Sequence, residues 1–139
     1  MVPKIVLDTN VIVSAFGWQG SPHHILLRCI AGDFRLHISP SLLQEATRVL
    51  AYPKLGFSQS QTDEFISLVV ELATIVEPDF TLDIIAADPS DNRILECAAA
   101  AGCRYIVTGD RHLLKLATWQ NIQILAPDVF LSHHPVKSR

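Results

Sequence analysis

Short apolar runs alternate with longer segments of helical periodicity along the chain. The first run, residues 5–7, is rich in β-branched side chains, which favour a strand. No polar residue alternates into it, so we expect a strand that is buried on both faces, as in the middle of a parallel sheet. Further strands are predicted at residues 34–39, 105–107 and 122–125. Asp8 follows the first run directly, so it lies at the carboxyl end of a strand, where open α/β sheets bind ligands.

The segments between the strands show helical spacing of their apolar residues, with Pro, Gly and small polar residues at their ends. Residues 14–20 are expected to form a loop, and residues 78–87 an irregular segment or a short strand. The apolar arc of the longest helix is too wide for a helix resting on one sheet, so its surplus is expected to contact a second subunit. Helices are predicted from Ser21 to Gly32, Ser39 to Pro53, Ser58 to Val76 with Ser60 as the cap, Asp88 to Gly102, around Leu113 to Leu116, and near Phe130.

Strands that alternate with helices predict an α/β fold with a parallel sheet. The 139 residues, of which 49% are hydrophobic, fit one packed domain at residues 1–132, followed by a polar tail at 133–139 that is expected to fray. No uncharged stretch is long enough to cross a bilayer, and the N-terminus lacks a signal-peptide pattern. Cys29, Cys97 and Cys103 lie in apolar surroundings and are expected to be buried, reduced thiols, as is usual in the cytoplasm.

Carboxylates follow two of the predicted strands. Asp8 ends the first strand, and Asp110 comes just after the strand at 105–107, with Gly109 allowing a sharp turn. If these parallel strands are neighbours, both carboxylates lie at one edge of the sheet. Asp91 shares a helical face with Ile94 and Ala98, so it points with the apolar stripe towards the same crevice rather than to solvent.

Two further acids have competing interpretations. Asp88, followed by Pro89, fits a helix N-cap, and a supporting role in the acidic crevice is the alternative. Glu45 lies at the edge of the apolar arc of its helix, which leaves both a solvated and a site position open. The remaining acids are expected to be outside the site, with Glu64, Glu71 and Glu96 on exposed helical faces.

Converging carboxylates repel one another, which favours either raised pKa values or bound cations. Oxygen ligands favour Mg²⁺ or Mn²⁺, and two such ions form the clamp used for phosphodiester hydrolysis. The net charge of −3 argues against a broad electrostatic grip on nucleic acid, but it allows nucleic acid reached through metal ions. The histidines show no pair with the spacing of a zinc site.

Five segments taken together resemble PIN-domain ribonucleases, and most of all the toxins of toxin–antitoxin pairs related to the VapC type. Each segment alone is a weak signal, but their order and spacing are specific and span nearly the whole chain. The segments are LDTNVIVSA at 7–15, SPSLLQEATRVL at 39–50, DPSDNRILECA at 88–98, YIVTGDRHLL at 105–114 and ILAPDVFL at 124–131.

The resemblance implies a three-layer α/β/α domain with a mainly parallel sheet, which cleaves RNA with Mg²⁺ or Mn²⁺. It also implies a cognate antitoxin, a homodimer and a cytoplasmic location. The metal-binding catalytic acids would be Asp8, Glu45, Asp91 and Asp110, and the supporting residues Thr9, Asn10, Asp88, Asn92 and Thr108. Many VapC-type toxins carry a further acid shortly after the last aspartate. Here His112 stands two places after Asp110, so the sequence leaves open whether one or two ions bind.

Three alternative functions would require other residues or the loss of some of these acids. A PIN fold that binds RNA or a protein without cutting would be expected to lose some of these acids. A receiver-type signalling domain would need an acidic pair after the first strand, where Asp8-Thr9-Asn10 stands. A phosphatase with an aspartate nucleophile would want a second aspartate at the position of Asn10.

Overall fold

The computed structural model describes residues 2–136 and contains one six-stranded sheet, in the order β3–β2–β1–β4–β6–β5. All neighbouring strands are parallel except β5 and β6, which are antiparallel. The predicted α/β fold with a mainly parallel sheet is therefore confirmed. The strands are β1 (Lys4–Leu7), β2 (Arg35–Ile38), β3 (Thr74–Ile75), β4 (Tyr105–Val107), β5 (Thr118–Trp119) and β6 (Ile122–Leu125).

Strand β1 lies in the middle of the sheet, between β2 and β4. Val6 pairs with His37 on one side and with Ile106 on the other. The side chains of Ile5 and Val6 are fully buried, as expected for a strand that is covered on both faces. The prediction that Asp8 follows a central, buried strand is confirmed.

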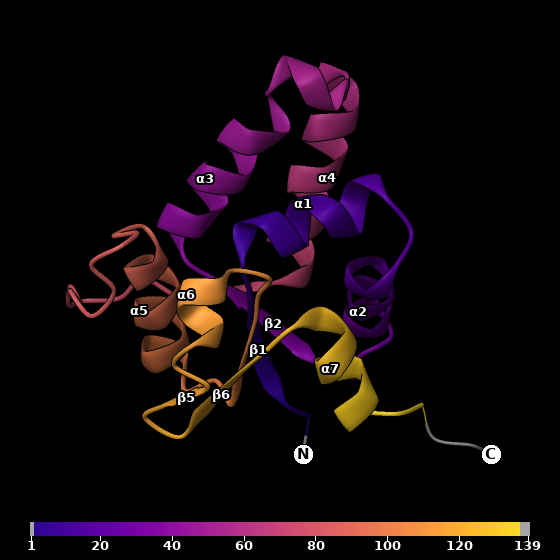
Figure 1. The fold of residues 1–139 in the computed structure, drawn as a ribbon. Helices are drawn as coiled ribbons and strands as arrows, with labels where there is room; N and C mark the ends of the chain where they lie inside the picture. Colours follow the sequence, from indigo (N-terminus) through magenta and orange to yellow (C-terminus); the bar gives the residue numbers. More distant parts are fainter. Residues whose placement is uncertain (1, 137–139) are drawn as a thin grey trace.

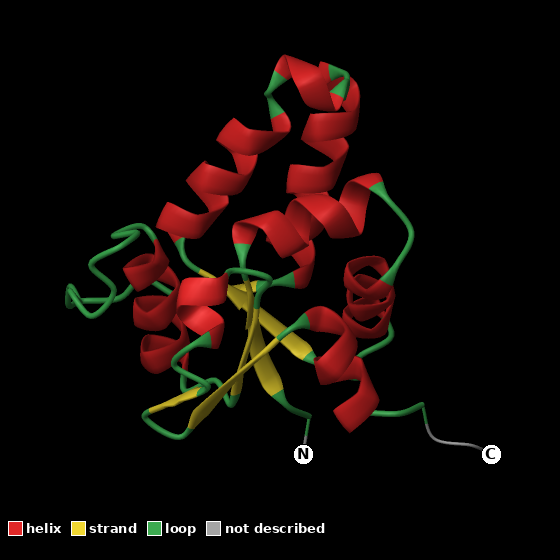
Figure 2. Ribbon diagram, viewed as in Figure 1, coloured by secondary structure: helices red, strands yellow, loops and turns green. Residues whose placement is uncertain are grey.

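Seven α-helices and a 3₁₀ turn surround the sheet in the described part of the chain. Figures 1 and 2 show α5 and α6 on one side of the sheet and α2 and α7 on the other, with α1, α3 and α4 beyond its carboxyl edge. The helices are α1 (Thr9–Gly17), α2 (Ser21–Ile30), α3 (Pro40–Leu50), α4 (Gln59–Leu72), α5 (Asp91–Ala101), α6 (Arg111–Leu114) and α7 (Pro127–His133), and the 3₁₀ turn is η1 (Pro53–Leu55).

The predicted loop at 14–20 is wrong over its first half, because α1 begins directly after Asp8 and continues to Gly17. Val11, Ile12 and Val13 are all buried, so the helix is enclosed on several sides and lacks the polar face by which a surface helix is recognised. Helix α1 contacts both α2 and α3, and these tertiary contacts outweigh the weak helix propensity of its β-branched residues.

The long helix predicted at 58–76 is shorter than expected. Ser58, not Ser60, is the N-cap, in a reciprocal capping box with Gln61. The helix ends at Leu72, and the following residues form the edge strand β3, which pairs with β2. Most of the wide apolar arc is buried or half-buried against the protein, which leaves Val70 exposed on this helix.

A short antiparallel strand was missed near the C-terminus. Gln120 and Asn121 both have positive φ angles, 49° and 65°, and form the tight turn that joins β5 to β6. Two consecutive positive φ angles are typical of a hairpin turn of the mirror-image type. The turn lacks the glycine that would have indicated it in the sequence.

The C-terminal segment is partly packed. His133 is the last residue of α7, and the ring of His134 lies against the rings of Phe34, Tyr105 and Phe130. His134, which the prediction places in the tail, therefore packs on the domain, and the domain boundary after residue 132 stays a prediction. Residues 137–139 lie outside the described part of the chain, and the expected fraying of the tail stays a prediction there.

All three cysteines are buried and form no disulfide, as predicted. Burial raises the pKa of each thiol to about 12, so these cysteines are inert packing residues. Among the described residues, no helix has both the length and the apolar character that a bilayer span requires.

Candidate functional site

The pairing of β1 with β4 determines the position of the first two acids. Leu7 pairs with Val107 across these strands, so Asp8 and Thr108 follow side by side at the carboxyl edge of the sheet. The Thr108 hydroxyl donates to Asp8 Oδ2 over 2.6 Å and accepts the backbone N–H of Asp110 over 2.9 Å. Thr108 is fully buried, so it connects the two strand ends rigidly.

Asp110 is held at the start of α6 by its own helix. Its Oδ1 atom accepts the backbone N–H groups of His112 over 2.7 Å and of Leu113 over 3.3 Å, which makes Asp110 the N-cap. The side chain stays 24% exposed, so it faces solvent at the edge of the sheet. These bonds occupy Oδ1 and leave Oδ2 as the oxygen available for a further ligand.

Asp91 is the first residue of α5 and is only 5% exposed. Its Oδ2 atom is buried and, within residues 2–136, has no hydrogen-bond partner. One donor atom each from Asp91, Asp110 and His112 lies within 4.8 Å of the others. A buried carboxylate oxygen without a partner is costly, and a cation between these donors would supply the missing interaction.

The electrostatics of these acids follow from burial and mutual repulsion. Burial raises the pKa of Asp91 to about 7, with further contributions from the charges of Asp110, Asp88 and Asp8. The pKa of Asp8 is also raised, first by burial and then by Asp110 and Glu45. The Thr108 hydroxyl and the backbone N–H of Asn10 partly oppose this rise. A site that disfavours several negative charges is a site that favours a cation.

Glu45 extends the acidic edge from α3. Its Oε2 atom accepts the Thr9 hydroxyl over 3.2 Å, and its charge adds to the repulsion at Asp8. Thr9 is buried and Glu45 is half-buried. The structure therefore brings Asp8, Glu45, Asp91 and Asp110 into one acidic region, and we refer to these four residues as the acidic edge.

Of the remaining supporting residues predicted from sequence, two shape the approach to α5. Asp88 Oδ1 accepts the backbone N–H and the hydroxyl of Ser90 over 3.2 and 2.6 Å. The prediction that Asp88 is the N-cap is wrong, because α5 begins at Asp91 with Ser90 as its N-cap, and Asp88 stabilises the turn before the helix. Asn92 is buried and accepts the N–H groups of Ile84 and Ile85 while its amide donates to backbone carbonyls. Asn92 thus anchors the incoming loop, and its hydrogen bonds go to that loop.

Asn10 lies in the first turn of α1 with an exposed side chain. Its backbone N–H, rather than its side-chain amide, interacts with Asp8.

Glu96 was predicted to be exposed, and this is wrong. It is 6% exposed, accepts the Leu82 N–H over 2.7 Å and forms an ion pair with Arg93 at 2.9 Å. The loop before α5 covers this part of the helix, and its irregular sequence gives no pattern from which that could be read.

His112 is the site residue that the sequence interpretation missed. No second histidine has zinc-type spacing with it, and its neighbours in the structure are two carboxylates. The available signal was its position two residues after a strand-ending aspartate, at a helix start.

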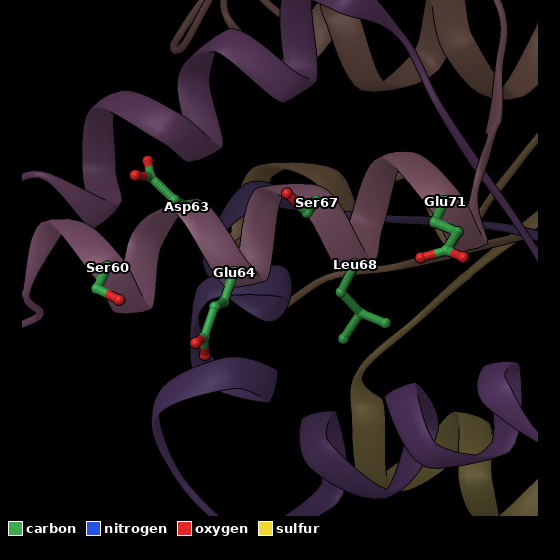
Figure 3. A pocket seen from close by; sticks show the side chains of 6 residues that line it. All are labelled: Ser60, Asp63, Glu64, Ser67, Leu68 and Glu71. Carbon is green, nitrogen blue, oxygen red and sulfur yellow. The ribbon is translucent and has the colours of Figure 1, made fainter.

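A separate group of acids lies on the outer surface of α4. It borders a shallow pocket of about 600 Å³ that also includes Ser60, Ser67 and Leu68. Figure 3 shows Asp63 and Glu64 pointing in different directions from the helix. Asp63 already accepts a hydrogen bond from Gln59, so this pocket lacks the convergence that the acidic edge shows.

The fold is shared with solved structures, of which two are described here. The structure of VapBC2 from Rickettsia felis, bound to a DNA fragment from their promoter, superposes with a TM-score of 0.61 at 16% identity, over 87% of this chain and 96% of that one. The structure of PAE2754 from Pyrobaculum aerophilum superposes with a TM-score of 0.63 at 17% identity, over 95% of this chain and 88% of that one. At these identities the likeness shows the fold alone. No curated protein matches this chain.

The sequence model of the PIN domain matches residues 4–112. This range begins at β1 and ends at His112, so it includes the whole acidic edge. The match covers most of the 139 residues, and the resemblance inferred from the five sequence segments is confirmed. The chain belongs to the PIN domain family.

Proposed function

We propose that this PIN domain is a metal-dependent endoribonuclease that hydrolyses RNA phosphodiester bonds with Mg²⁺ or Mn²⁺. The observation that carries the proposal is the buried Oδ2 atom of Asp91 beside Asp110, which has no hydrogen-bond partner among residues 2–136. A carboxylate is kept there at an electrostatic cost, although an asparagine would fit the same space. Such a cost is typical of a functional site.

The acidic edge supplies the proposed metal ligands, and two neighbouring threonines orient its side chains. Asp91 and Asp110 present oxygen atoms to the space between them, and Asp8 adds charge from the central strand. Thr108 orients Asp8 and Asp110 together, and Thr9 orients Glu45. When bound, the metal ion supplies an activated water and stabilises charge on the phosphate oxygens.

The approach to the site suits a phosphodiester backbone. Arg111 follows Asp110 directly and is exposed, so a cation lies at the rim of the acidic edge. Asp110 and His112 are partly exposed as well, which leaves the site open to a polymer. With a net charge of −3, the protein would bind RNA through this local arrangement rather than through a basic surface.

The biological role that we propose is that of the toxin in a toxin–antitoxin pair, acting in the cytoplasm as a homodimer. Support comes from the fold that the chain shares with VapBC2. An antitoxin segment that covers the acidic edge would block access to it. Val70 on α4 and Ile75 on β3 are 44% and 48% exposed, and they are our candidates for a dimer contact.

The test compares the wild type with Asp8→Asn and with Asp79→Asn, an exposed aspartate outside the acidic edge. We expect wild type and Asp79→Asn to cleave total RNA with Mn²⁺, to stop when EDTA is added, and to recover when Mn²⁺ is restored. Asp8→Asn should fold with an unchanged circular dichroism spectrum and should not cleave. Unchanged metal-dependent cleavage by Asp8→Asn would contradict the proposal. Folded wild-type protein that neither binds Mn²⁺ in calorimetry nor cleaves RNA would favour a non-catalytic binding module.

A further inference from the structure

We propose that His112 is a direct nitrogen ligand in the metal site and that it makes the site prefer a first-row transition-metal dication, such as Mn²⁺, over Mg²⁺. The inference rests on the proposed metal-dependent function and adds the identity of a ligand and of the preferred ion. The nitrogen would share the ion with Asp91 and Asp110.

The geometry places the imidazole among the carboxylate donors. One ring nitrogen of His112 lies within 4.8 Å of a carboxylate oxygen of both Asp91 and Asp110. Three donor atoms that are at most 4.8 Å apart enclose a point within about 2.8 Å of each of them, whereas metal–donor distances are about 2.1–2.2 Å. The three side chains therefore need to move inward by at most about 0.6 Å to contact a common ion.

The other role open to His112 is to orient Asp110, and the contacts argue against it. The Nδ1 atom is 3.5 Å from Asp110 Oδ1, at the outer limit of a hydrogen bond. That same oxygen already accepts two backbone N–H groups, from His112 and Leu113. The backbone alone fixes the Asp110 side chain, so the imidazole is not needed for that purpose.

The backbone also fixes the histidine. Its N–H group donates to Asp110 over 2.7 Å, which holds the start of α6 against the acidic edge. Its side chain is 36% exposed, so the ring can turn towards an ion without opening the core. Asp91 contributes the third donor from the start of α5, with a buried Oδ2 atom that has no partner in the described chain.

The ligand set determines the preferred ion. Mg²⁺ binds oxygen donors in a strict octahedral geometry and keeps several waters, whereas imidazole binds transition-metal ions better. A third carboxylate at position 112 would have completed an all-oxygen site. With histidine there, the site gains a nitrogen donor, which favours Mn²⁺ over Mg²⁺. The site also carries one negative charge fewer, which weakens the binding of both ions.

The test measures ion binding directly, without relying on cleavage. Mn²⁺ bound to the full-length wild-type protein should show ¹⁴N modulation of one imidazole in pulsed electron paramagnetic resonance. His112→Ala should lose the modulation and bind Mn²⁺ at least roughly tenfold more weakly in calorimetry, while its Mg²⁺ affinity changes little. His112→Asp should bind Mg²⁺ more tightly than His112→Ala does. His24→Ala, which removes an exposed histidine of α2, should match the wild type.

The outcomes separate this inference from the proposed function. Bound Mn²⁺ without ¹⁴N modulation, or modulation that persists in His112→Ala, overturns the nitrogen ligand but leaves the ribonuclease proposal standing. An equal loss of Mn²⁺ and Mg²⁺ affinity in His112→Ala overturns the selectivity. A folded wild-type protein that binds neither ion overturns both proposals. Urea unfolding of each variant shows whether weaker binding reflects a lost ligand or a lost fold.

Discussion

Replacing Asp91 with asparagine should stabilise the ion-free protein, by an amount that grows as the pH rises. In the folded protein the pKa of Asp91 is raised from 3.8 to about 7, so the folded state holds this proton more tightly than the unfolded chain does. The wild type therefore keeps this contribution to stability below about pH 4 and loses it as the pH rises to about 7. Asparagine does not ionise, so residue 91 of the variant causes no loss of stability over the same pH interval.

The size of the effect follows from the distances in the site. Donor atoms of Asp91 and Asp110 lie within 4.8 Å of each other. At that separation two unit charges repel by about 1 kcal/mol in bulk water and by about 3 kcal/mol at an effective dielectric constant of 20. Asp91 is 5% exposed, so the upper part of this range applies. We expect the free energy of unfolding of Asp91→Asn to exceed that of the wild type by about 2–3 kcal/mol at pH 8.

The assay is urea unfolding in EDTA at pH 4, 6 and 8, followed by circular dichroism. Asp79→Asn serves as the control, because it removes an exposed carboxylate and keeps Asp91, so its difference in unfolding free energy from the wild type should not change with pH. Adding Mn²⁺ at pH 8 should reverse the order, since the ion stabilises the wild type and not the variant. A difference in unfolding free energy between Asp91→Asn and wild type that stays constant or shrinks from pH 4 to pH 8 would contradict this prediction.

Three other substitutions test the supporting structure. Thr108→Val removes the hydroxyl that joins Asp8 and Asp110 and should lower the free energy of unfolding, measured in urea, by about 2–4 kcal/mol. Its control is Thr62→Val, at a site on α4 that is also buried, which should have a much smaller effect. Ser58→Ala breaks the capping box of α4 and should lower the free energy of unfolding by about 1 kcal/mol, measured by thermal unfolding. An equal loss in Ser60→Ala would contradict the assignment of Ser58 as the N-cap. Asn92→Ala releases the backbone at Ile84 and Ile85 and should expose that loop to limited proteolysis, so a digestion pattern like that of the wild type would contradict its anchoring role.

The sequence predicts the structure best at the two strand ends that carry the acids. The runs before Asp8 and before Asp110 are short, apolar and rich in β-branched residues, so each indicates a buried strand without help from the rest of the chain. Neighbouring parallel strands end at one edge of the sheet. If the two strands are neighbours, their carboxylates are therefore predicted to lie close together. Asp91 was predictable for a similar reason, because its helical angle matches that of its apolar neighbours.

Elsewhere the local pattern of apolar and polar residues was insufficient to predict the structure. The buried helix α1 carries too few polar residues to reveal its period, and Glu96 is covered by a loop that has no period at all. His112 gave no metal signal because its partners are carboxylates, one of which is distant in the sequence.

Local sequence patterns are enough to predict the class of fold, the central strand and three acids of the acidic edge, since these depend on residues close together in the chain. Contacts between elements that are distant in the chain place His112 beside Asp91 and Asp110 and direct the hydrogen bonds of Asn92 to the loop rather than to the site. They also leave Asp91 Oδ2 without a hydrogen-bond partner among residues 2–136. Those features depend on how α5, β4 and α6 pack against one another, and packing joins atoms that no local pattern relates.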